Sequence, residues 1–364
     1  MSEEKFTPDK LMCDEDVSLD GLDVKFYDVK DEPFRVYGLY DYKNENVFKR
    51  LPDEIGLHTN EGVAQLYLNT AGGRVRFSTD SDYIVLRAYM PHIGHHNHMS
   101  LLGGSGFDLY IDDPVTGTST YANSFRPPYH MTNGYISIFH FKRDKQLRHL
   151  TINFPTYSNV DRLEIGLQES ASVGRGLPYR NKKPFVFYGS SITQGGCASR
   201  PGNNYISLVC RRLNMDYVNL GFSGSGKAED LIVDYMADLE MSAFISDYDH
   251  NAPNAEHLRA SHCKMYQKIR EKHPSIPYLM MSRPDFIGHP SRIKDSAARR
   301  DVIIDTFRYA RAQGDENVYY IDGESYFHGT WEDACTVDGT HPNDLGFMYM
   351  AEKVLATLKH FEFE

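Results

Sequence analysis

The chain has 364 residues, of which 41% are hydrophobic and 24% charged, a composition typical of globular proteins and unlike disordered or low-complexity chains. Its 39 basic and 50 acidic residues give a formal net charge of −11, which makes nucleic acid and anionic membranes unfavourable partners. No run approaches the roughly 18 apolar residues of a membrane-spanning helix, so no membrane partner is expected. At roughly 100–200 residues per domain, the length predicts two domains.

The sequence begins with MSEEKFTPDK, which is acidic and lacks the apolar segment of a secretory signal. The five cysteines are widely spaced and form no C-x-x-C pair, which favours reduced thiols over a disulfide framework. Both observations predict a cytoplasmic protein. A secreted protein that has lost its signal is the alternative.

From about residue 20 to residue 170 the pattern is one of short alternating segments bounded by turns. Residues 74–78, 83–89, 135–139 and 150–154 alternate apolar and polar side chains with period two, as half-buried strands do. Val75 and Phe77 are expected to face inward. No amphipathic helix of ten residues is recognisable, so residues 1–172 are predicted to form a β-sandwich, jelly-roll-like in its topology.

After residue 183, apolar strand segments alternate with helical segments. The order predicts a five-stranded parallel sheet with helices on both faces, over residues 184–364. A linker is expected at 169–183. The predicted strands are 184–188, 217–220, 243–247, 277–281 and 318–321, and the predicted helices are 205–213, 228–239, 256–272, 296–313 and 343–359.

In such a sheet the site lies beyond the carboxyl ends of the strands, so the residues that follow each strand are candidates. The first strand is followed by Gly-Ser-Ser-Ile-Thr, in which Ser191 occupies a tight turn where a nucleophile can be held. A serine-rich loop that only caps a helix is the alternative.

The second strand is followed by Gly-Phe-Ser-Gly-Ser-Gly-Lys-Ala, which nearly spells a phosphate-binding loop. Ala228 replaces the hydroxyl residue that would hold magnesium, so a nucleotide site is disfavoured. The backbone N–H of Gly224 could instead stabilise an oxyanion. After the third strand, the amide of Asn251 could do the same. The nearby Asp and His residues could bind a metal, although they do not form a closed ligand set, or could form a plain turn.

Asp338 and His341 lie three residues apart just before the last helix. This spacing lets a carboxylate contact one ring nitrogen while the other faces a nucleophile. A helix-start turn with capping side chains is the alternative. Nucleophile, base, orienting carboxylate and oxyanion donors would then all follow strands of one sheet.

These motifs, in this order, resemble the SGNH hydrolases, the GDSL-type esterase superfamily, over roughly residues 184–359. The resemblance implies a three-layer flavodoxin-like domain, with Ser191 as nucleophile, His341 as base and Asp338 as its partner. It also implies an oxyanion hole formed by Ser191, Gly224 and Asn251. The chain departs from the family pattern at Ser190, which replaces an Asp, and at Asp249 and Ala252, which replace Gly and Asp.

Residues 106–110, Gly-Phe-Asp-Leu-Tyr, are similar to the G-x-D-L-Y signature of a β-domain that precedes some SGNH hydrolases. Relatives with this arrangement are described as carbohydrate esterases that remove acetyl groups from plant polysaccharides or oligosaccharides. The resemblance therefore implies an acetylated carbohydrate as partner, and neither a metal nor an organic cofactor. Arg200, Asn204 and Arg283 could contact sugar hydroxyls, although helix capping and surface ion pairs explain them equally well.

Residues 92–98 contain four histidines, a density that can bind zinc. A polar loop between strands is the favoured interpretation, and a loop that contacts substrate is a third possibility. Cys197 has no base in this scheme and is not expected to be a nucleophile.

Three functions follow from these patterns. The first is a serine esterase that deacetylates carbohydrate through an acyl-enzyme. The second is an esterase or thioesterase that acts on a different acyl substrate. The third is a non-catalytic carbohydrate-binding protein, against which the intact Ser191, Asp338 and His341 argue. The sequence leaves the sugar, the acetyl position and the oligomeric state open.

Overall fold

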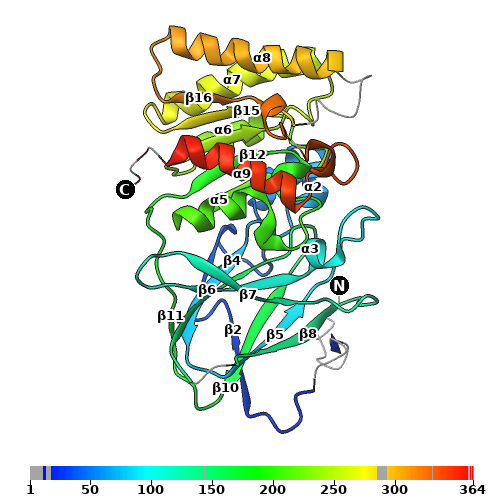
Figure 1. Cartoon of the computed structure of the whole chain (residues 1–364), viewed down its shortest axis with the longest axis vertical. Helices are drawn as coiled ribbons and strands as arrows, with labels where there is room; N and C mark the ends of the chain where they lie inside the picture. The colour runs from blue at the N-terminus through cyan, green and yellow to red at the C-terminus, as the bar shows by residue number, and fades with distance from the viewer. Residues whose placement is uncertain are drawn as a thin grey trace.

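The computed structural model describes residues 11–13, 18–142, 145–284, 293–329, 331–359, 361 and 363. The first ten residues, which carry the prediction that no secretory signal is present, and Glu364 lie outside the described residues. Figure 1 shows a sheet-rich N-terminal domain stacked below a domain of helices and strands. This two-domain order confirms the predicted fold class.

The N-terminal domain consists of two packed sheets. One has the order β1-β8-β5-β10-β2, and the other has β11-β4-β9-β6-β7 with β3 on the side of β4. Val75 and Phe77 of β4 lie in the core between the sheets, as expected. The strands are β1 (Met12–Cys13), β2 (Val24–Asp28), β3 (Arg35–Tyr37), β4 (Arg74–Thr79), β5 (Tyr83–Tyr89), β6 (Phe107–Asp112), β7 (Ser119–Phe125), β8 (Gly134–His140), β9 (Arg148–Asn153), β10 (Arg162–Gln168) and β11 (Val173–Arg175).

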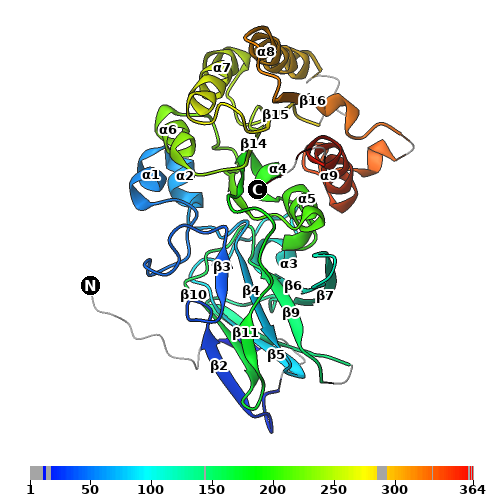
Figure 2. The same cartoon turned by 90° about the vertical axis from the view of Figure 1, so that its left-hand side faces the viewer.

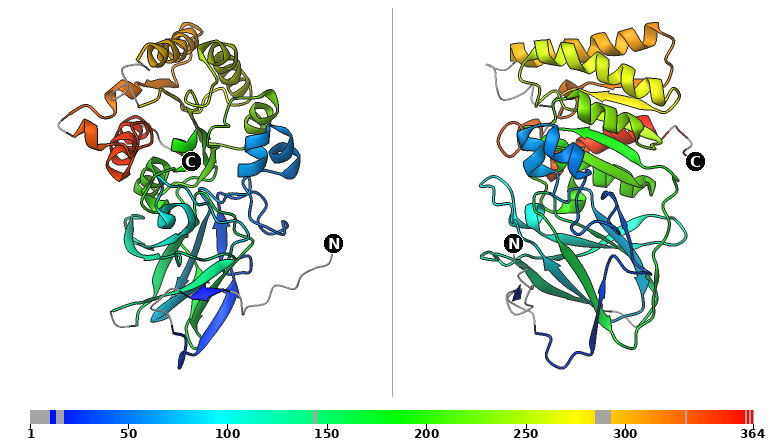
Figure 3. Two further views of the ribbon diagram at one scale, coloured as in Figure 1. Left: turned by 90° about the vertical axis from the view of Figure 1, so that its right-hand side faces the viewer. Right: turned by 180° about the vertical axis from the view of Figure 1, so that it is seen from behind.

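The division at residues 172 and 184 remains a proposal, because two features cross it. Strand β11 lies inside the predicted linker and pairs with β4 of the sandwich. Two short helices from the N-terminal region, α1 (Asp53–His58) and α2 (Glu61–Leu66), lie beside the α/β domain. Val63 belongs to the core of that domain, and Figures 2 and 3 show both helices next to α6. A third short helix is α3 (Leu101–Ser105).

The C-terminal domain contains a parallel sheet of five strands in the order β13-β12-β14-β15-β16. The chain starts in the second strand and crosses once to the edge, the order of flavodoxin-like sheets. The strands are β12 (Phe185–Gly189), β13 (Tyr217–Gly221), β14 (Ala243–Asp247), β15 (Tyr278–Met281) and β16 (Val318–Ile321), and the helices are α4 (Ser191–Gln194), α5 (Tyr205–Leu213), α6 (Asp230–Asp238), α7 (Ala255–Lys272), α8 (Ile293–Ala312) and α9 (Asp344–Leu358).

Alternation along the strands produces one core on each face of this sheet. Val186 and Tyr188 pack under α6, α7 and α8, whereas Phe185 and Phe187 pack under α5 and α9. Asparagines begin three of the helices of this domain, because an Asn side chain accepts a hydrogen bond from a free N–H of the first turn. The residues are Asn204 for α5, Asn254 for α7 and Asn343 for α9. In the described part of the chain, no helix has the length and apolar character needed to cross a bilayer.

Candidate active site

The carboxyl ends of three neighbouring strands are level with one another. Gly189 at the end of β12 pairs with Gly221 at the end of β13 and with Asp247 at the end of β14. The loops that follow these strands therefore start side by side. They carry Ser191, Gly224 and Asn251, respectively.

Ser191 is the first residue of the one-turn helix α4. The hydroxyl of Ser190 accepts a hydrogen bond from the N–H of Ile192 at 3.2 Å and so begins the helix. Gly195 ends it with a φ of +103°, a left-handed conformation that glycine adopts without steric cost. The Ser190 hydroxyl thus serves as the helix cap in a position where the family pattern has an Asp.

The structure brings Ser191, His341 and Asp338 into one chain of hydrogen bonds. The Ser191 Oγ lies 2.9 Å from Nε2 of His341, and Nδ1 of the same ring lies 2.8 Å from Oδ2 of Asp338. Ser191 is 8% exposed, whereas the side chains of His341 and Asp338 are 20% and 37% exposed, so the site opens to solvent on the His341 side.

Asp338 and His341 are held by a tight loop between residue 335 and α9. The other carboxylate oxygen of Asp338 accepts hydrogen bonds from the backbone N–H of His341 at 2.8 Å and of Thr340 at 3.0 Å. Partial burial alone would raise the pKa of Asp338, but these bonds and the His341 ring lower it to about 2. The Asp338 carboxylate is therefore ionised at every pH above about 3.

The candidate oxyanion donors follow β13 and β14. Gly224 has a φ of +68°, and no acceptor among the described residues takes the backbone N–H of Gly224 or Ser191. One amide hydrogen of Asn251 is donated to the carbonyl of Phe222 at 2.8 Å, which ties the two loops together. The second amide hydrogen of Asn251 is not used by this bond.

Sequence reasoning missed Gln194, which joins the nucleophile turn to the loop after β13. Its side-chain carbonyl accepts a hydrogen bond from the N–H of Ser223 at 3.0 Å. Its amide donates to Asn69 at 3.1 Å and to the carbonyl of Thr156 at 3.0 Å, both from the N-terminal domain. A glutamine placed three residues after the candidate nucleophile is the signal that could have pointed to it.

The G-x-D-L-Y signature joins the two domains. Asp108 is fully buried and accepts hydrogen bonds at 2.8 Å from the N–H of Gly202 and from the amide of Asn153. Burial raises the pKa of this carboxyl, an effect that these two bonds oppose. The hydroxyl of Tyr157, also from the N-terminal domain, donates to the carbonyl of Ser191 at 3.3 Å. The sandwich thus braces the turn that carries Ser191.

The three residues predicted to contact substrate have protein partners in the structure, and their contact with sugar stays a prediction. The Asn204 side chain caps α5 at the N–H of Ser207 and donates to the carbonyl of Pro201. Arg283 is 5% exposed and donates to the hydroxyl of Ser296. Arg200 lies over the ring of Tyr121 at 3.9 Å. These partners agree with the alternative interpretation, in which the three side chains cap helices and pack against neighbours.

The histidine loop of residues 92–98 reaches the site through one member. The ring of His98 lies 5.3 Å from the ring of His341, between centroids. His96 lies 5.1 Å from the ring of Tyr157, while His95 is exposed. Cys197 lies near both His98 and His341. Burial, with a smaller contribution from Asp338, raises the pKa of the Cys197 thiol to about 12, which disfavours it as a nucleophile.

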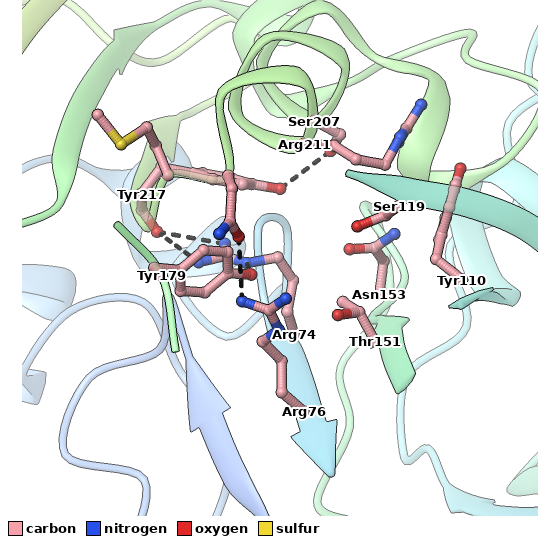
Figure 4. A pocket seen from close by; sticks show the side chains of 12 residues that line it. Arg74, Arg76, Tyr110, Ser119, Thr151, Asn153, Tyr179, Ser207, Arg211 and Tyr217 are labelled. Atoms are coloured by element: carbon pink, nitrogen blue, oxygen red, sulfur yellow. Dashed lines mark hydrogen bonds between the residues drawn. The ribbon is translucent and has the colours of Figure 1, made fainter. Parts of the chain in front are cut away.

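A separate cavity lies between the domains. Figure 4 shows Arg74 and Arg76 rising from β4 toward Tyr179 and Tyr217. Arg74 pairs with Asp216 at 2.5 Å and Arg76 with Asp112 at 2.9 Å. The cavity measures about 20 Å³, enough for one water molecule, so it is part of the domain joint and not a substrate site.

Comparison with known proteins gives matches for both domains. Residues 182–359 match the GDSL-like lipase/acylhydrolase family. Residues 24–173 match the family described as the N-terminus of SGNH-hydrolase-type esterases, which carries the name GxDLY. No curated protein matches the chain.

Solved structures match over nearly the whole chain. A Bacteroides ovatus protein classed as a GDSL-like lipase is 26% identical, with a TM-score of 0.82 over 94% of this chain and 99% of its own. Salicylyl-acyltransferase SsfX3, from a tetracycline biosynthetic pathway, is 20% identical, with a TM-score of 0.73 over 93% of this chain and 97% of its own. A family two carbohydrate esterase from Clostridium thermocellum, in complex with cellohexaose, is 14% identical, with a TM-score of 0.60 over 90% of this chain and 98% of its own.

Proposed function

We propose that this chain, a carboxylic ester hydrolase with a GDSL-like lipase/acylhydrolase domain behind an N-terminal domain of the SGNH-esterase type, removes acetyl groups from carbohydrate. The observation that carries the proposal is the hydrogen-bonded series Ser191, His341 and Asp338 at 2.9 and 2.8 Å. This is the arrangement that nucleophilic acyl transfer by a serine requires.

In the proposed reaction, His341 takes the proton of Ser191 through Nε2 while the serine oxygen attacks the ester carbonyl. Asp338 holds the ring through Nδ1 and stabilises the imidazolium. The backbone N–H groups of Ser191 and Gly224 and the amide of Asn251 stabilise the negative oxygen of the tetrahedral intermediate. The sugar alcohol leaves with the proton from His341, and water then repeats the attack to release acetate. No step needs a metal or an organic cofactor.

Carbohydrate is proposed as the substrate for two reasons. Proteins of the same two-domain fold include a family two carbohydrate esterase in complex with cellohexaose. The net charge of −11 suits a neutral glycan better than an anionic polymer.

Four cysteines of the described part are free thiols, which is consistent with a reducing compartment such as the cytoplasm.

A different acyl substrate is the second candidate. The salicylyl-acyltransferase superposes with a TM-score of 0.73, against 0.60 for the carbohydrate esterase. The same Ser191 chemistry would then pass an acyl group from another ester or a thioester to water or to an alcohol.

The experiment is acetate release from acetylated xylan, mannan and pectin fragments, with p-nitrophenyl acetate and butyrate as general esters. Wild type is compared with Ser191→Ala and with Ser242→Ala, a control serine at the opposite end of β14. We expect release from one glycan to be lost in Ser191→Ala and kept in Ser242→Ala. Activity on the nitrophenyl esters alone would select the second candidate. A chain inactive on every ester would overturn the catalytic role and leave a carbohydrate-binding protein.

A further inference from the structure

We propose that His98, Cys197 and His341 form a binding site for a thiophilic divalent cation of the Zn²⁺ class, and that the bound ion inhibits hydrolysis. One ligand atom from each of the three side chains lies within 4.8 Å of the other two. The inhibition rests on the proposed function, whereas the binding does not.

The three ligands come from segments that are far apart in the sequence. His98 belongs to the loop before α3 of the N-terminal domain, Cys197 follows α4, and His341 precedes α9. Their proximity is therefore a product of the domain arrangement. Zn²⁺ bonds of about 2.0–2.3 Å place tetrahedral ligands roughly 3.3–3.8 Å apart, so a contraction of about 1 Å would complete the set. Two imidazoles and one thiolate match the ligands that zinc prefers.

His341 is already oriented as a metal-binding histidine would be. Its Nδ1 faces Asp338 at 2.8 Å, and Nε2 is the nitrogen that remains for an ion. Histidines that bind metals commonly donate their other ring N–H to a carboxylate in this way, which fixes the tautomer and strengthens the ligand. The pair that would activate Ser191 is thus also a carboxylate–histidine pair fit for a cation.

Cys197 supplies the preference for a thiophilic ion. Its Sγ lies 3.5 Å from the carbonyl of His98, so the thiol already faces the histidine loop. On binding, the S–H bond breaks, a bond from sulfur to the metal forms, and the proton passes to solvent. Mg²⁺ and Ca²⁺ prefer oxygen ligands and would bind this set poorly.

Occupation of the site removes the base from the proposed reaction. The lone pair on Nε2 of His341 that would accept the proton of Ser191 is the one the cation takes. The ion therefore competes with the hydrogen bond of 2.9 Å between Ser191 and His341. Removal of the ion by a chelator restores that bond, so the inhibition is reversible.

The test uses the full chain with CoCl₂ and ZnCl₂ alone. Cobalt reports binding without any activity, through the sulfur-to-cobalt charge-transfer band and the d–d bands of a tetrahedral site. Zinc is titrated against p-nitrophenyl acetate hydrolysis, with each variant compared with its own metal-free rate. The variants are Cys197→Ser and His98→Ala, and the matched controls are Cys263→Ser on α7 and His95→Ala in the same loop.

We expect wild type and both controls to show the charge-transfer band and a zinc inhibition that EDTA reverses. Cys197→Ser should lose the band, and both site variants should need at least about tenfold more zinc for half inhibition. The proposal is overturned if wild type gives no band, or if zinc inhibits both site variants as strongly as wild type. If the chain hydrolyses no ester, the cobalt spectra of wild type and Cys197→Ser still decide the binding site, while the proposed function fails separately.

Discussion

Arg50 donates a hydrogen bond to the carbonyl of Gly221 at 2.5 Å, across 171 residues of sequence. Its other terminal nitrogen donates to the carbonyl of Leu66 at 2.7 Å, and its guanidinium lies 4.4 Å from the centre of the Phe222 ring. The side chain is 1% exposed. A buried cation from the N-terminal region therefore holds the backbone just before Gly224, the candidate oxyanion donor.

Replacement of Arg50 should lower kcat, because the backbone that positions Gly224 is then held less firmly. Arg50→Lys keeps the charge but loses the fork that reaches both carbonyls, so we expect kcat to fall about tenfold or more, with KM changed by about twofold or less. Arg50→Met leaves buried carbonyls unpaired and should lower the free energy of unfolding by about 2–4 kcal/mol. Steady-state kinetics and urea unfolding measure both effects. Arg35→Lys, at an exposed arginine, is the control. A normal kcat in folded Arg50→Lys would refute the positioning role.

Asn251 is predicted to act mainly in the transition state. Asn251→Ala, and Asn251→Asp with its similar shape but no amide donor, should lower kcat on the order of 10²–10³ with little change in KM. The matched control is Asn254→Ala, since Asn254 caps α7 through the N–H of His257 at 2.8 Å. That control should lose about 1 kcal/mol of stability and keep its kcat. Equal kcat values in the two Ala variants would exclude Asn251 as an oxyanion donor.

Asp338→Asn should reduce kcat by up to about 10⁴-fold, because the amide favours the wrong tautomer of His341 and cannot stabilise the imidazolium. The wild-type pKa of Asp338, about 2, keeps the carboxylate charged at every pH above about 3. We therefore divide kcat/KM of wild type by kcat/KM of Asp338→Asn at each pH. This ratio should show no titration of Asp338 between pH 4 and pH 9. Rates on p-nitrophenyl acetate across this range measure it. A carboxyl titration above pH 4 would contradict the assignment of Asp338 as the partner of His341.

His262 of α7 should make stability depend on pH far from the site. It is fully buried beside the ring of Tyr248, its Nδ1 has no partner among the described residues, and burial lowers its pKa to about 4. The unfolded state then binds more protons than the folded state between about pH 6.5 and pH 4. Stability is thus complete above pH 6.5 and is lost as pH falls, by about 2 kcal/mol at pH 5.

His262→Phe keeps an aromatic ring in that place and removes the titration. Urea unfolding of wild type and variant at pH 7.5 and pH 5 measures the difference between them. From pH 7.5 to pH 5, we expect the free energy of unfolding of wild type to fall by about 2 kcal/mol more than that of the variant. An unchanged difference would mean that His262 is protonated in the folded protein or hydrated.

The sequence alone determined the order of the elements and the residues that come together at the strand ends. Helix α5 and strands β14 and β16 begin and end at the predicted residues, because α5 has a helical apolar period and the two strands are short apolar segments. Parallel strands end at one edge of the sheet, so residues that follow them are expected to lie close together. The sequence could therefore nominate Ser191, Gly224, Asn251 and the Asp338 loop.

Only the tertiary structure decided how these residues are held. Arg50, Gln194 and Tyr157 bind backbone groups of the site from segments with no periodic signal, and α1 and α2 belong by packing to the domain that follows them. The sequence could not separate Asn204 as a helix cap from Asn204 as a sugar contact, since an amide side chain can hydrogen-bond either partner. Contacts between distant segments depend on how two folded surfaces pack together, and a local pattern of residues does not determine that packing.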